Sequence, residues 1–346
     1  MKEVGLEYPK EYILQARNEG KLLGLGLELT SKCNLKCVYC YTCTGKPPLE
    51  NELTYEEIIN IIEQALPLGL RKVGIVGRGE PLLDLRLPKL VSFSFQKGLR
   101  VTVYTNGTLI NKSLADLFFS TETSLVISLN SLRAEVNDYL RGVNGTLKKT
   151  LAGIKMLKDV GYPDRKHKVI IESVVTRYNM NDLPTLWKWA REQGFIPDIE
   201  RLTLTFCGRA GHDIHVSPRK LFNLFKTLRK IDESEFGLTW DVQPPHAGFY
   251  CTRHFYGCLI NAWGYVQPCS GLAIHIANVR RKRLESILRH PIIRNLRHID
   301  RTIKGPCRTC IYHEKNLCYG CRAQAYYLTG DYLASDPECW YIQCRK

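Results

Sequence analysis

Cys33-Asn-Leu-Lys-Cys37-Val-Tyr-Cys40 is the stretch of sequence that decides the fold. Its three cysteines follow a short apolar run, Leu22 to Leu29, which predicts a buried strand that leads into a loop. Fe–S clusters are usually held by four cysteine thiolates, so three thiolates would leave one iron of a cube open to another ligand. A zinc site, a disulfide pair and inert buried thiols are the alternatives, and zinc would need a fourth ligand.

The composition predicts an ordered protein in a reducing compartment. The 346 residues fit two domains, or one large domain with an extension, and the 44% apolar content provides a full core. The chain has no apolar run of about 18 residues and its first residues lack a signal-peptide core, so we expect no membrane span and a cytoplasmic location. The 14 cysteines are therefore better explained by metal ligation than by disulfides, which implies an anaerobic setting.

The charge is strongly positive, with 49 Lys and Arg against 34 Asp and Glu, and part of the excess lies between Arg280 and Lys304. A basic stripe can attract nucleic acid, an acidic peptide or an anionic small molecule, and a solvated helix face is the alternative. No aromatic-rich RNA-binding signature accompanies the stripe, so we do not expect a nucleic-acid partner.

Predicted strands and helices alternate from the cysteine loop to about residue 210. Thr54-Tyr-Glu-Glu57 is a capping box that opens a helix through Ala65. Alternation of this kind predicts a parallel sheet with right-handed crossovers, and six units leave one side of a barrel open for a large substrate. The other strands are predicted at 71–76, 101–105, 125–130, 169–176 and 202–210, and the other helices at 8–20, 146–157 and 217–232.

Polar residues follow several of these strands. Gly77-Arg-Gly-Glu80-Pro81 follows the second strand, where small residues let the backbone approach a ligand and the Glu80 carboxylate can accept from an ammonium group. The carboxyl ends of parallel strands face the active side of such barrels. Thr105, Asn106, Ser128 and Asn130 are therefore candidate site residues, with turn formation or strand capping as the alternative.

Cys33, Cys37 and Cys40, with Tyr39 before the last cysteine, resemble the cluster loop of radical S-adenosylmethionine (radical SAM) enzymes. The resemblance runs from about Leu22 to Cys339. It implies an α/β fold, a partial (β/α)6 TIM-like barrel with a C-terminal cysteine-rich extension.

The resemblance also implies a set of SAM contacts. The turn formed by Gly77 to Pro81, called the glycine turn below, is similar to the family turn that binds the SAM amino group. Arg78 stands where the family usually has glycine. Arg141 resembles the arginine that reaches the SAM carboxylate, since a guanidinium pairs a carboxylate bidentately; an exposed turn residue is the alternative. The family usually has an acidic residue where Asn130 stands. The implied contacts are Tyr39, Gly77, Gly79, Glu80, Thr105, Asn106, Ser128, Asn130, Arg141 and Ser173.

Cysteines return after residue 247 at ordered spacings. The pattern is Cys251-x6-Cys258-x10-Cys269, followed by Cys307-x2-Cys310-x7-Cys318-x2-Cys321-x17-Cys339. The two Cys-x2-Cys pairs fit a zinc ribbon, but a ribbon would leave the other cysteines unexplained. Eight ligands fit two further cubes better.

This second region resembles the SPASM extension of radical SAM enzymes, which carries two auxiliary 4Fe-4S clusters. By position, auxiliary cluster I would use Cys251, Cys258, Cys269 and Cys321, and auxiliary cluster II would use Cys307, Cys310, Cys318 and Cys339. Two spacings around Cys318 depart from the family, and Cys344 is an alternative to Cys339. Cys207 is a candidate hydrogen-atom donor to a substrate radical, with packing as the alternative.

These features imply a radical SAM oxidoreductase that uses SAM and three 4Fe-4S clusters. Reductive cleavage of SAM would give a 5′-deoxyadenosyl radical that removes a substrate hydrogen atom, and the auxiliary clusters would handle the product electron. We expect crosslinking, oxidation or decarboxylation of a peptide or protein. The alternative is dehydrogenation, decarboxylation or epimerisation of an anionic small molecule, sugar or tetrapyrrole.

The expected partners are a substrate of one of these classes and a low-potential electron donor of the ferredoxin or flavodoxin type. The ~30 residues before the cluster strand are too few for a recognition domain of roughly 80 residues, so a peptide substrate would require a separate leader-binding protein. A non-enzymatic Fe–S carrier or a zinc-ribbon nucleic-acid binder is opposed by the glycine turn and the barrel pattern. The expected divisions are a lead-in helix (1–20), the partial barrel (21–212), a bridging helix and linker (213–247) and the SPASM domain (248–346).

Overall fold

Parallel strands form the centre of the fold in this computed structural model, which describes residues 8–42, 51–204 and 212–343. Within these residues the strand order is β6-β5-β4-β3-β2-β1-β7-β8-β9; β1 to β7 are parallel, and β8 and β9 are antiparallel additions at one edge. The strands are β1 (Gly24–Glu28), β2 (Lys72–Val76), β3 (Arg100–Thr105), β4 (Ser124–Ser128), β5 (Val169–Val175), β6 (Ile196–Arg201), β7 (Gly257–Ile260), β8 (Tyr265–Gln267) and β9 (Ala277–Asn278).

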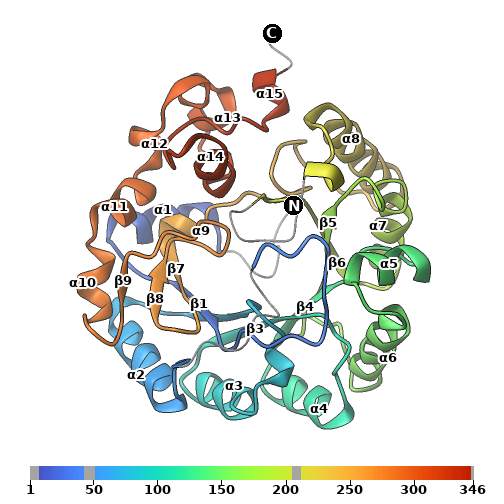
Figure 1. Ribbon diagram of the computed structural model, residues 1–346, viewed down its shortest axis with the longest axis horizontal. Helices are drawn as coiled ribbons and strands as arrows, with labels where there is room; N and C mark the ends of the chain where they lie inside the picture. Colours follow the sequence, from blue (N-terminus) through green and yellow to red (C-terminus); the bar gives the residue numbers. More distant parts are fainter. Residues whose placement is uncertain (1–7, 43–50, 205–211, 344–346) are drawn as a thin grey trace.

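Helices cover the outside of the curved sheet, as Figure 1 shows for α2, α3, α4, α6 and α7. The predicted capping box is present at the start of α2, because Glu57 N–H donates to Thr54 Oγ1 and Thr54 N–H donates to Glu57 Oε2. The helices of the barrel half are α1 (Lys10–Asn18), α2 (Tyr55–Ala65), α3 (Leu87–Gln96), α4 (Lys112–Ser120), α5 (Ala134–Arg141), α6 (Thr146–Asp159), α7 (Leu183–Glu192) and α8 (Pro218–Glu235).

The C-terminal part is built from short helices around cysteine-bearing turns, beside α1 and α8 (Figure 1). These helices are α9 (Arg253–Tyr256), α10 (Leu284–Leu288), α11 (Pro291–Arg297), α12 (Ile299–Thr302), α13 (Ile311–Glu314), α14 (Arg322–Thr329) and α15 (Trp340–Gln343). The predicted fold class is confirmed: a partial (β/α)6 TIM-like barrel carries a cysteine-rich C-terminal extension. No helix in the described part of the chain is long and apolar enough to cross a membrane.

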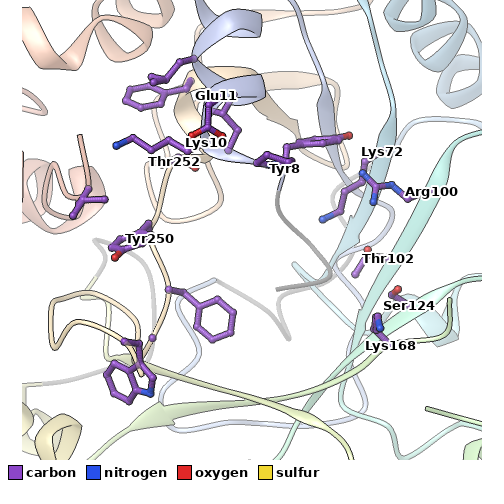
Figure 2. A pocket seen from close by; sticks show the side chains of 18 of the residues that line it. Tyr8, Lys10, Glu11, Lys72, Arg100, Thr102, Ser124, Lys168, Tyr250 and Thr252 are labelled. Atoms are coloured by element: carbon purple, nitrogen blue, oxygen red, sulfur yellow. The ribbon is translucent and has the colours of Figure 1, made fainter. Parts of the chain in front are cut away.

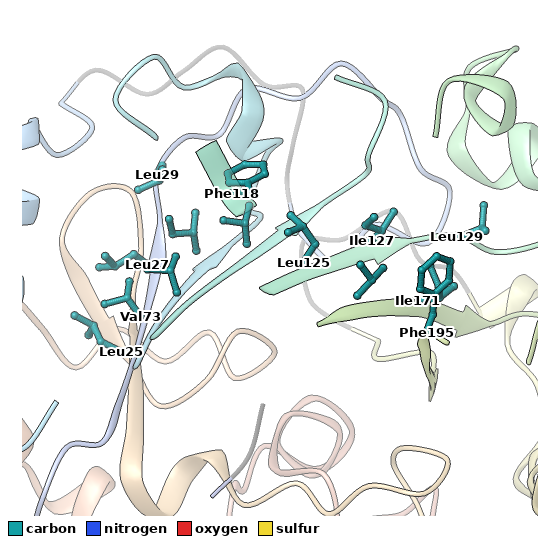
Figure 3. Close-up of a cluster of buried hydrophobic side chains, with 14 of the residues drawn as sticks. Leu25, Leu27, Leu29, Val73, Phe118, Leu125, Ile127, Leu129, Ile171 and Phe195 are labelled. Carbon is teal, nitrogen blue, oxygen red and sulfur yellow. The ribbon is translucent and has the colours of Figure 1, made fainter. Parts of the chain in front are cut away.

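The strands present two different faces because successive side chains alternate. Leu25, Val73, Leu125 and Ile171 point outward and are fully buried against the helices (Figure 3). Burying one such side chain stabilises the fold by roughly 1.5–3 kcal/mol. On β1 the alternate residues are glycines, so the inner face encloses a lumen rather than a packed core.

The sixth strand lies upstream of its predicted place. The sequence predicts a strand at 202–210, whereas β6 is Ile196–Arg201. Leu202 and Leu204 pack on Ile214 beyond β6, and residues 205–210 of the predicted strand lie outside the described residues. Strand β6 ends at Arg201 because β5 ends at Val175, which pairs with Arg201. Pro197 makes this segment a poor strand candidate from sequence, but β6 is an edge strand, where proline is tolerated.

A buried carboxylate joins α7, α8 and the segment that follows them. Asp232 is completely buried and accepts from Trp187 Nε1 at 2.8 Å, Trp240 Nε1 at 2.9 Å and Arg191 Nη2 at 2.7 Å. Buried charges of this kind are stable only when they are paired and hydrogen-bonded. Asp232 therefore fixes α8 against the rest of the barrel.

Replacement of this carboxylate is expected to destabilise the fold strongly. Asp232→Ala leaves two indole N–H groups and a guanidinium without their acceptor, and loss of one partner of a buried pair costs about 3–5 kcal/mol. Urea unfolding should show this loss. Glu233→Ala is the matched control, since its pair with Arg229 is partly exposed and should change the free energy of unfolding by less than about 1 kcal/mol. Equal losses in the free energy of unfolding for the two substitutions would contradict the conclusion that Asp232 fixes α8 against the barrel.

Candidate active site

The glycine turn after β2 is locked against the start of the cysteine loop. Gly79 N–H donates to the Thr30 carbonyl at 3.0 Å, and Glu80 N–H donates to the Lys32 carbonyl at 2.7 Å. A Cβ atom on Gly79 would lie 2.0 Å from the Lys32 carbonyl oxygen, which is far inside van der Waals contact. Glycine is therefore required for the turn and the cysteine loop to meet.

Glu80 lies at the centre of this junction. Its carboxylate accepts from the Thr105 hydroxyl at 2.5 Å, Asn106 N–H at 2.8 Å and Leu82 N–H at 3.1 Å. Burial raises the pKa of Glu80, and the hydrogen bonds from Asn106, Thr105 and Leu82 oppose this rise. A carboxylate has about four acceptor positions, so one remains for an ammonium group.

The cysteine loop presents three thiols that are close to one another and form no disulfide. Burial raises the pKa of Cys33 to about 11; Leu35 N–H opposes the rise, and the neighbouring Cys37, Glu80 and Cys40 add to it. Burial thus disfavours an uncompensated thiolate at Cys33, so a cationic ligand is needed there if this thiol is to be charged. A cluster iron at each thiolate would supply that charge, and this donor set fits the three-cysteine site that the sequence predicts.

Asn34 supports the cysteine loop from inside. Its Oδ1 accepts from Asn106 Nδ2 at 2.8 Å, and its Nδ2 donates to Thr108 Oγ1 at 2.9 Å. Asn106 therefore connects the loop to the residues that follow β3. The sequence analysis did not single out Asn34, although it lies between the candidate ligands Cys33 and Cys37 in the sequence.

Arg141 is the last residue of α5 and is buried, not exposed in a turn. Its Nη1 lies 3.7 Å from Cys37 Sγ, and its Nη2 donates to the Ser128 carbonyl. The cysteine loop approaches the end of α5 closely, since a Cβ atom on Gly142 would lie 2.3 Å from the Lys36 carbonyl oxygen. The guanidinium is thus placed next to the thiols, where it can also pair an incoming carboxylate.

Asn130 leaves a buried acceptor free at the same place. Its Nδ2 donates to the Tyr39 hydroxyl at 2.8 Å, while its Oδ1 is buried and has no hydrogen-bond partner among the described residues. An orphaned buried acceptor is costly unless a ligand satisfies it. This observation fits a bound ligand with a donor group beside Tyr39 and the cysteine loop.

The structure does not bring every predicted SAM contact to this site. Ser173 is on the outer face of β5, and its hydroxyl donates to the Leu129 carbonyl. Ser128 points to the lumen, where its hydroxyl donates to Glu172 Oε2 at 3.4 Å. Cys207 lies outside the described residues, as do Cys43 and Cys344.

Arg78 turns away from the cysteine loop. Its Nε donates to Glu28 Oε2 at 3.0 Å, and its guanidinium stacks on the Trp263 ring at 4.7 Å. Burial raises the pKa of Glu28, and the Arg78 charge opposes that rise. The residue that replaces the usual family glycine thus fills a place at the end of β1 and leaves the turn itself intact.

The barrel lumen contains a cluster of acidic residues that sequence reasoning missed. His246 Nδ1 lies 3.0 Å from Asp198 Oδ1, and its Nε2 lies 3.3 Å from Glu200 Oε2. Burial alone would lower the pKa of His246, but these carboxylates raise it to about 9. Burial, together with Glu200 and Asp198, raises the pKa of Glu172 to about 8. Glu172 therefore keeps its proton to a higher pH than an exposed glutamate does. Glu172 alternates with outward-pointing apolar residues on β5, as Asp198 and Glu200 do on β6, and this alternation could have predicted that the three carboxylates face the lumen.

Two of the four cysteines proposed for auxiliary cluster I, Cys269 and Cys321, lie next to each other. Cys258 and Cys269 line one small cavity beside the inner face of β1 and β2. Burial raises the pKa of Cys269 to about 11, and the nearby Cys321 thiol adds to this rise. Cys251 precedes α9 in the same region.

The cysteines proposed for auxiliary cluster II form a second group. Burial raises the pKa of Cys339 to about 12, and Cys307 is among the neighbours that add to this rise. Burial also raises the pKa of Cys318, with Cys339 and Cys307 contributing. Cys310 N–H donates to the Cys307 carbonyl, which places both in one turn. The described residues contain no set of three or more His, Cys, Asp or Glu side chains arranged for a single metal ion.

A methyl group at the glycine turn is expected to separate it from the cysteine loop. Gly79→Ala places a Cβ atom on the Lys32 carbonyl, so the anaerobically purified variant should lose about four irons per chain, the content of one cube. Gly74→Ala in the preceding strand is the control, because its Cβ atom would meet nothing closer than 3.9 Å. Full iron content in Gly79→Ala would show that the junction tolerates a side chain.

The raised pKa of Glu172 predicts a pH dependence of stability. Between the ordinary pKa of 4.5 and the folded value of about 8, the folded state binds a proton that the unfolded state releases, so stability falls as pH rises through this window. Glu172→Gln should match the wild type near pH 5 and melt at a higher temperature near pH 8.5. Glu135→Gln, an exposed carboxylate on α5, should track the wild type throughout. Parallel curves of melting temperature against pH for Glu172→Gln and the wild type would contradict the raised pKa of Glu172.

Comparison with known proteins agrees with this arrangement. The radical SAM superfamily model matches residues 27–190, and the SPASM iron-sulfur cluster-binding domain model matches residues 251–311. An AdoMet-dependent heme synthase of Methanosarcina barkeri is 29% identical over 92% of this chain and 96% of its own length. PqqA peptide cyclase of Granulibacter bethesdensis is 25% identical over 92% of this chain and 87% of its own length.

A solved structure shares the fold. Streptococcus suis SuiB bound to S-adenosylmethionine superposes with a TM-score of 0.73 at 20% sequence identity, and the match covers 92% of this chain and 77% of SuiB. The two family models together support SAM and 4Fe-4S clusters as cofactors. This chain is an enzyme that belongs to the radical SAM superfamily and carries a C-terminal SPASM domain.

Proposed function

We propose that this enzyme oxidatively decarboxylates the carboxyethyl side chains of a tetrapyrrole, with SAM and three 4Fe-4S clusters as cofactors. The observation that carries the proposal is the match to the M. barkeri heme synthase, which spans 92% of this chain and 96% of that enzyme. A match over both lengths includes the barrel and the cysteine-rich extension alike. Tetrapyrroles were the alternative substrate class in the sequence analysis, and this similarity makes them the first candidate.

The chain supplies the binding groups for the cofactors. Cys33, Cys37 and Cys40 would hold one cluster, the remaining acceptor position of Glu80 would take the SAM ammonium group, and Arg141 would pair its carboxylate. When they are bound, SAM and the reduced cluster supply a 5′-deoxyadenosyl radical that removes a hydrogen atom from the substrate. A low-potential ferredoxin- or flavodoxin-type protein would provide the electron.

The proposed reaction balances with one electron to be accepted. A carboxyethyl group, R–CH2–CH2–CO2−, loses a hydrogen atom from the carbon next to the ring, and then CO2 and one electron, to give a vinyl group, R–CH=CH2. The two cysteine groups of the C-terminal part would hold the auxiliary clusters that take up this electron. Oxidative chemistry thus gives the SPASM domain a role that a redox-neutral rearrangement would not need.

A peptide or protein is the second candidate substrate. The similarity to PqqA peptide cyclase favours it, at 25% identity over 92% of this chain. This function would require a separate leader-binding protein. The lower identity places it behind the tetrapyrrole proposal.

The test is an anaerobic reaction of reconstituted enzyme with SAM, reductant and the iron complex of a porphyrin bearing four carboxyethyl groups. We expect 5′-deoxyadenosine and a porphyrin that has lost CO2 and two hydrogens for each vinyl group formed, measured by mass spectrometry. Cys37→Ala removes one cluster thiolate and should yield neither product. An unchanged porphyrin, alongside SAM cleavage that responds to a peptide, would transfer the proposal to the peptide class.

A further inference from the structure

A large cavity lies at the amino-terminal mouth of the barrel, at the opposite end from the cysteine loop and the glycine turn. Its volume is about 1120 Å³, which exceeds the range of roughly 300–1,000 Å³ typical of small-molecule sites. The first residues of β2 and β3 form one wall, and α1 and the segment around Tyr250 form the others (Figure 2). The cavity has room for a ligand the size of a tetrapyrrole.

Strand register places three cations on the wall of this cavity. Lys72 and Arg100 are direct partners in the pairing of β2 with β3, so both side chains point to the same face of the sheet. Leu125 N–H donates to the Lys168 carbonyl at 2.9 Å, which sets Lys168 beside Ser124 on the adjacent strands. Because Ser124 also lines the cavity, Lys168 points inward with it. The three cations therefore form one basic row at the mouth.

Two members of the basic row form no ion pair within the residues that the structure describes. In the described part of the chain, neither Arg100 nor Lys168 forms an ion pair, whereas Lys166 on the cavity rim pairs with Glu122 at 2.5 Å. The Arg100 guanidinium stacks on the Tyr8 ring at 5.1 Å and is thereby held at the cavity edge. Cations that face a cavity without an internal partner are suited to bind an anion there.

The opposite wall of the cavity is aromatic. Phe249 and Tyr250 line it, and Figure 2 shows Tyr250 across the open space from Lys168 and Arg100. Aromatic side chains provide a flat apolar surface on which a planar ring can stack. The cavity thus combines a basic row with an aromatic wall.

The cavity continues toward the cysteine loop along β2. Lys72 also lines the small inner cavity, together with Gly74 and Tyr104. From Lys72 to Gly77 the chain advances by five residues, or roughly 16 Å at strand rise. A planar ligand anchored at the mouth can therefore extend along the lumen, where the absence of a side chain on Gly74 leaves room.

The geometry points to the basic row of Lys72, Arg100 and Lys168 as the site that binds the non-reacting carboxylates of a planar polycarboxylate substrate. This inference rests on the proposed function and names how its substrate is held. The reacting side chain would then extend along β2 toward the glycine turn. The row would select for ligands with carboxylates at one edge and an apolar ring behind them.

The test measures binding without turnover. Metal-free coproporphyrin III, a fluorescent tetracarboxylate, is titrated into the anaerobic holoenzyme in the absence of reductant and SAM. The double variant Arg100→Gln/Lys168→Gln should weaken binding at least tenfold, and Lys168→Arg, which keeps the charge, should bind like the wild type. Lys155→Gln is the matched control, because Lys155 lies on the outer helix α6 in an exposed pair with Asp159 and should leave the dissociation constant unchanged.

The outcomes separate this inference from the proposed function. The tetramethyl ester of the same porphyrin lacks the charges, so its binding should not differ between the wild type and the double variant. Tight binding of coproporphyrin III that is equal in the wild type and the folded double variant would overturn the basic row and leave the proposed function standing. A wild-type holoenzyme that does not bind the tetracarboxylate at all would overturn both.

Discussion

The close contact between the Gly79 backbone and the Lys32 carbonyl is the constraint on which the candidate site depends. It joins the turn after β2 to the loop after β1, and so sets Glu80 beside the three thiols. Neither segment has regular secondary structure that would place it independently. The backbone hydrogen bonds between them, together with those from Thr105 and Asn106 to Glu80, hold the thiols and the carboxylate in one rigid unit.

The barrel has a different chemistry at each end. At the carboxyl ends of the strands lie the thiols, Glu80 and Arg141, while the amino ends carry the basic row and the large cavity. Between them, the lumen holds His246 with its carboxylate partners and Glu172, whose pKa is raised. Such a division suits a reaction in which the radical forms at one end and the charged parts of the substrate are bound at the other.

The cysteine-rich extension is continuous with the barrel. Strand β7 pairs with β1, which sets Cys258 next to Leu25 in the same sheet. On the other side, Arg201 at the end of β6 forms a buried ion pair with Asp336, and the same carboxylate accepts from Cys321 N–H at 2.8 Å. The thiols of the extension are thus fixed to both edges of the six-stranded unit, so their distance from the lumen is set by the sheet itself.

The sequence by itself determined the barrel class, the cysteine loop, the glycine turn and the cysteines of the extension. The alternation of predicted strands and helices indicates the barrel, and the other features are recognised from the spacing of residues that are close together in the chain. It missed the strand at Ile196–Arg201, since this segment contains a proline and becomes a strand only by pairing with β5. Only the tertiary structure decided the lumen cluster, the Arg78–Glu28 pair and the basic row. Those groups join residues far apart in the chain, and strand register and burial, rather than neighbouring residues, bring their side chains together.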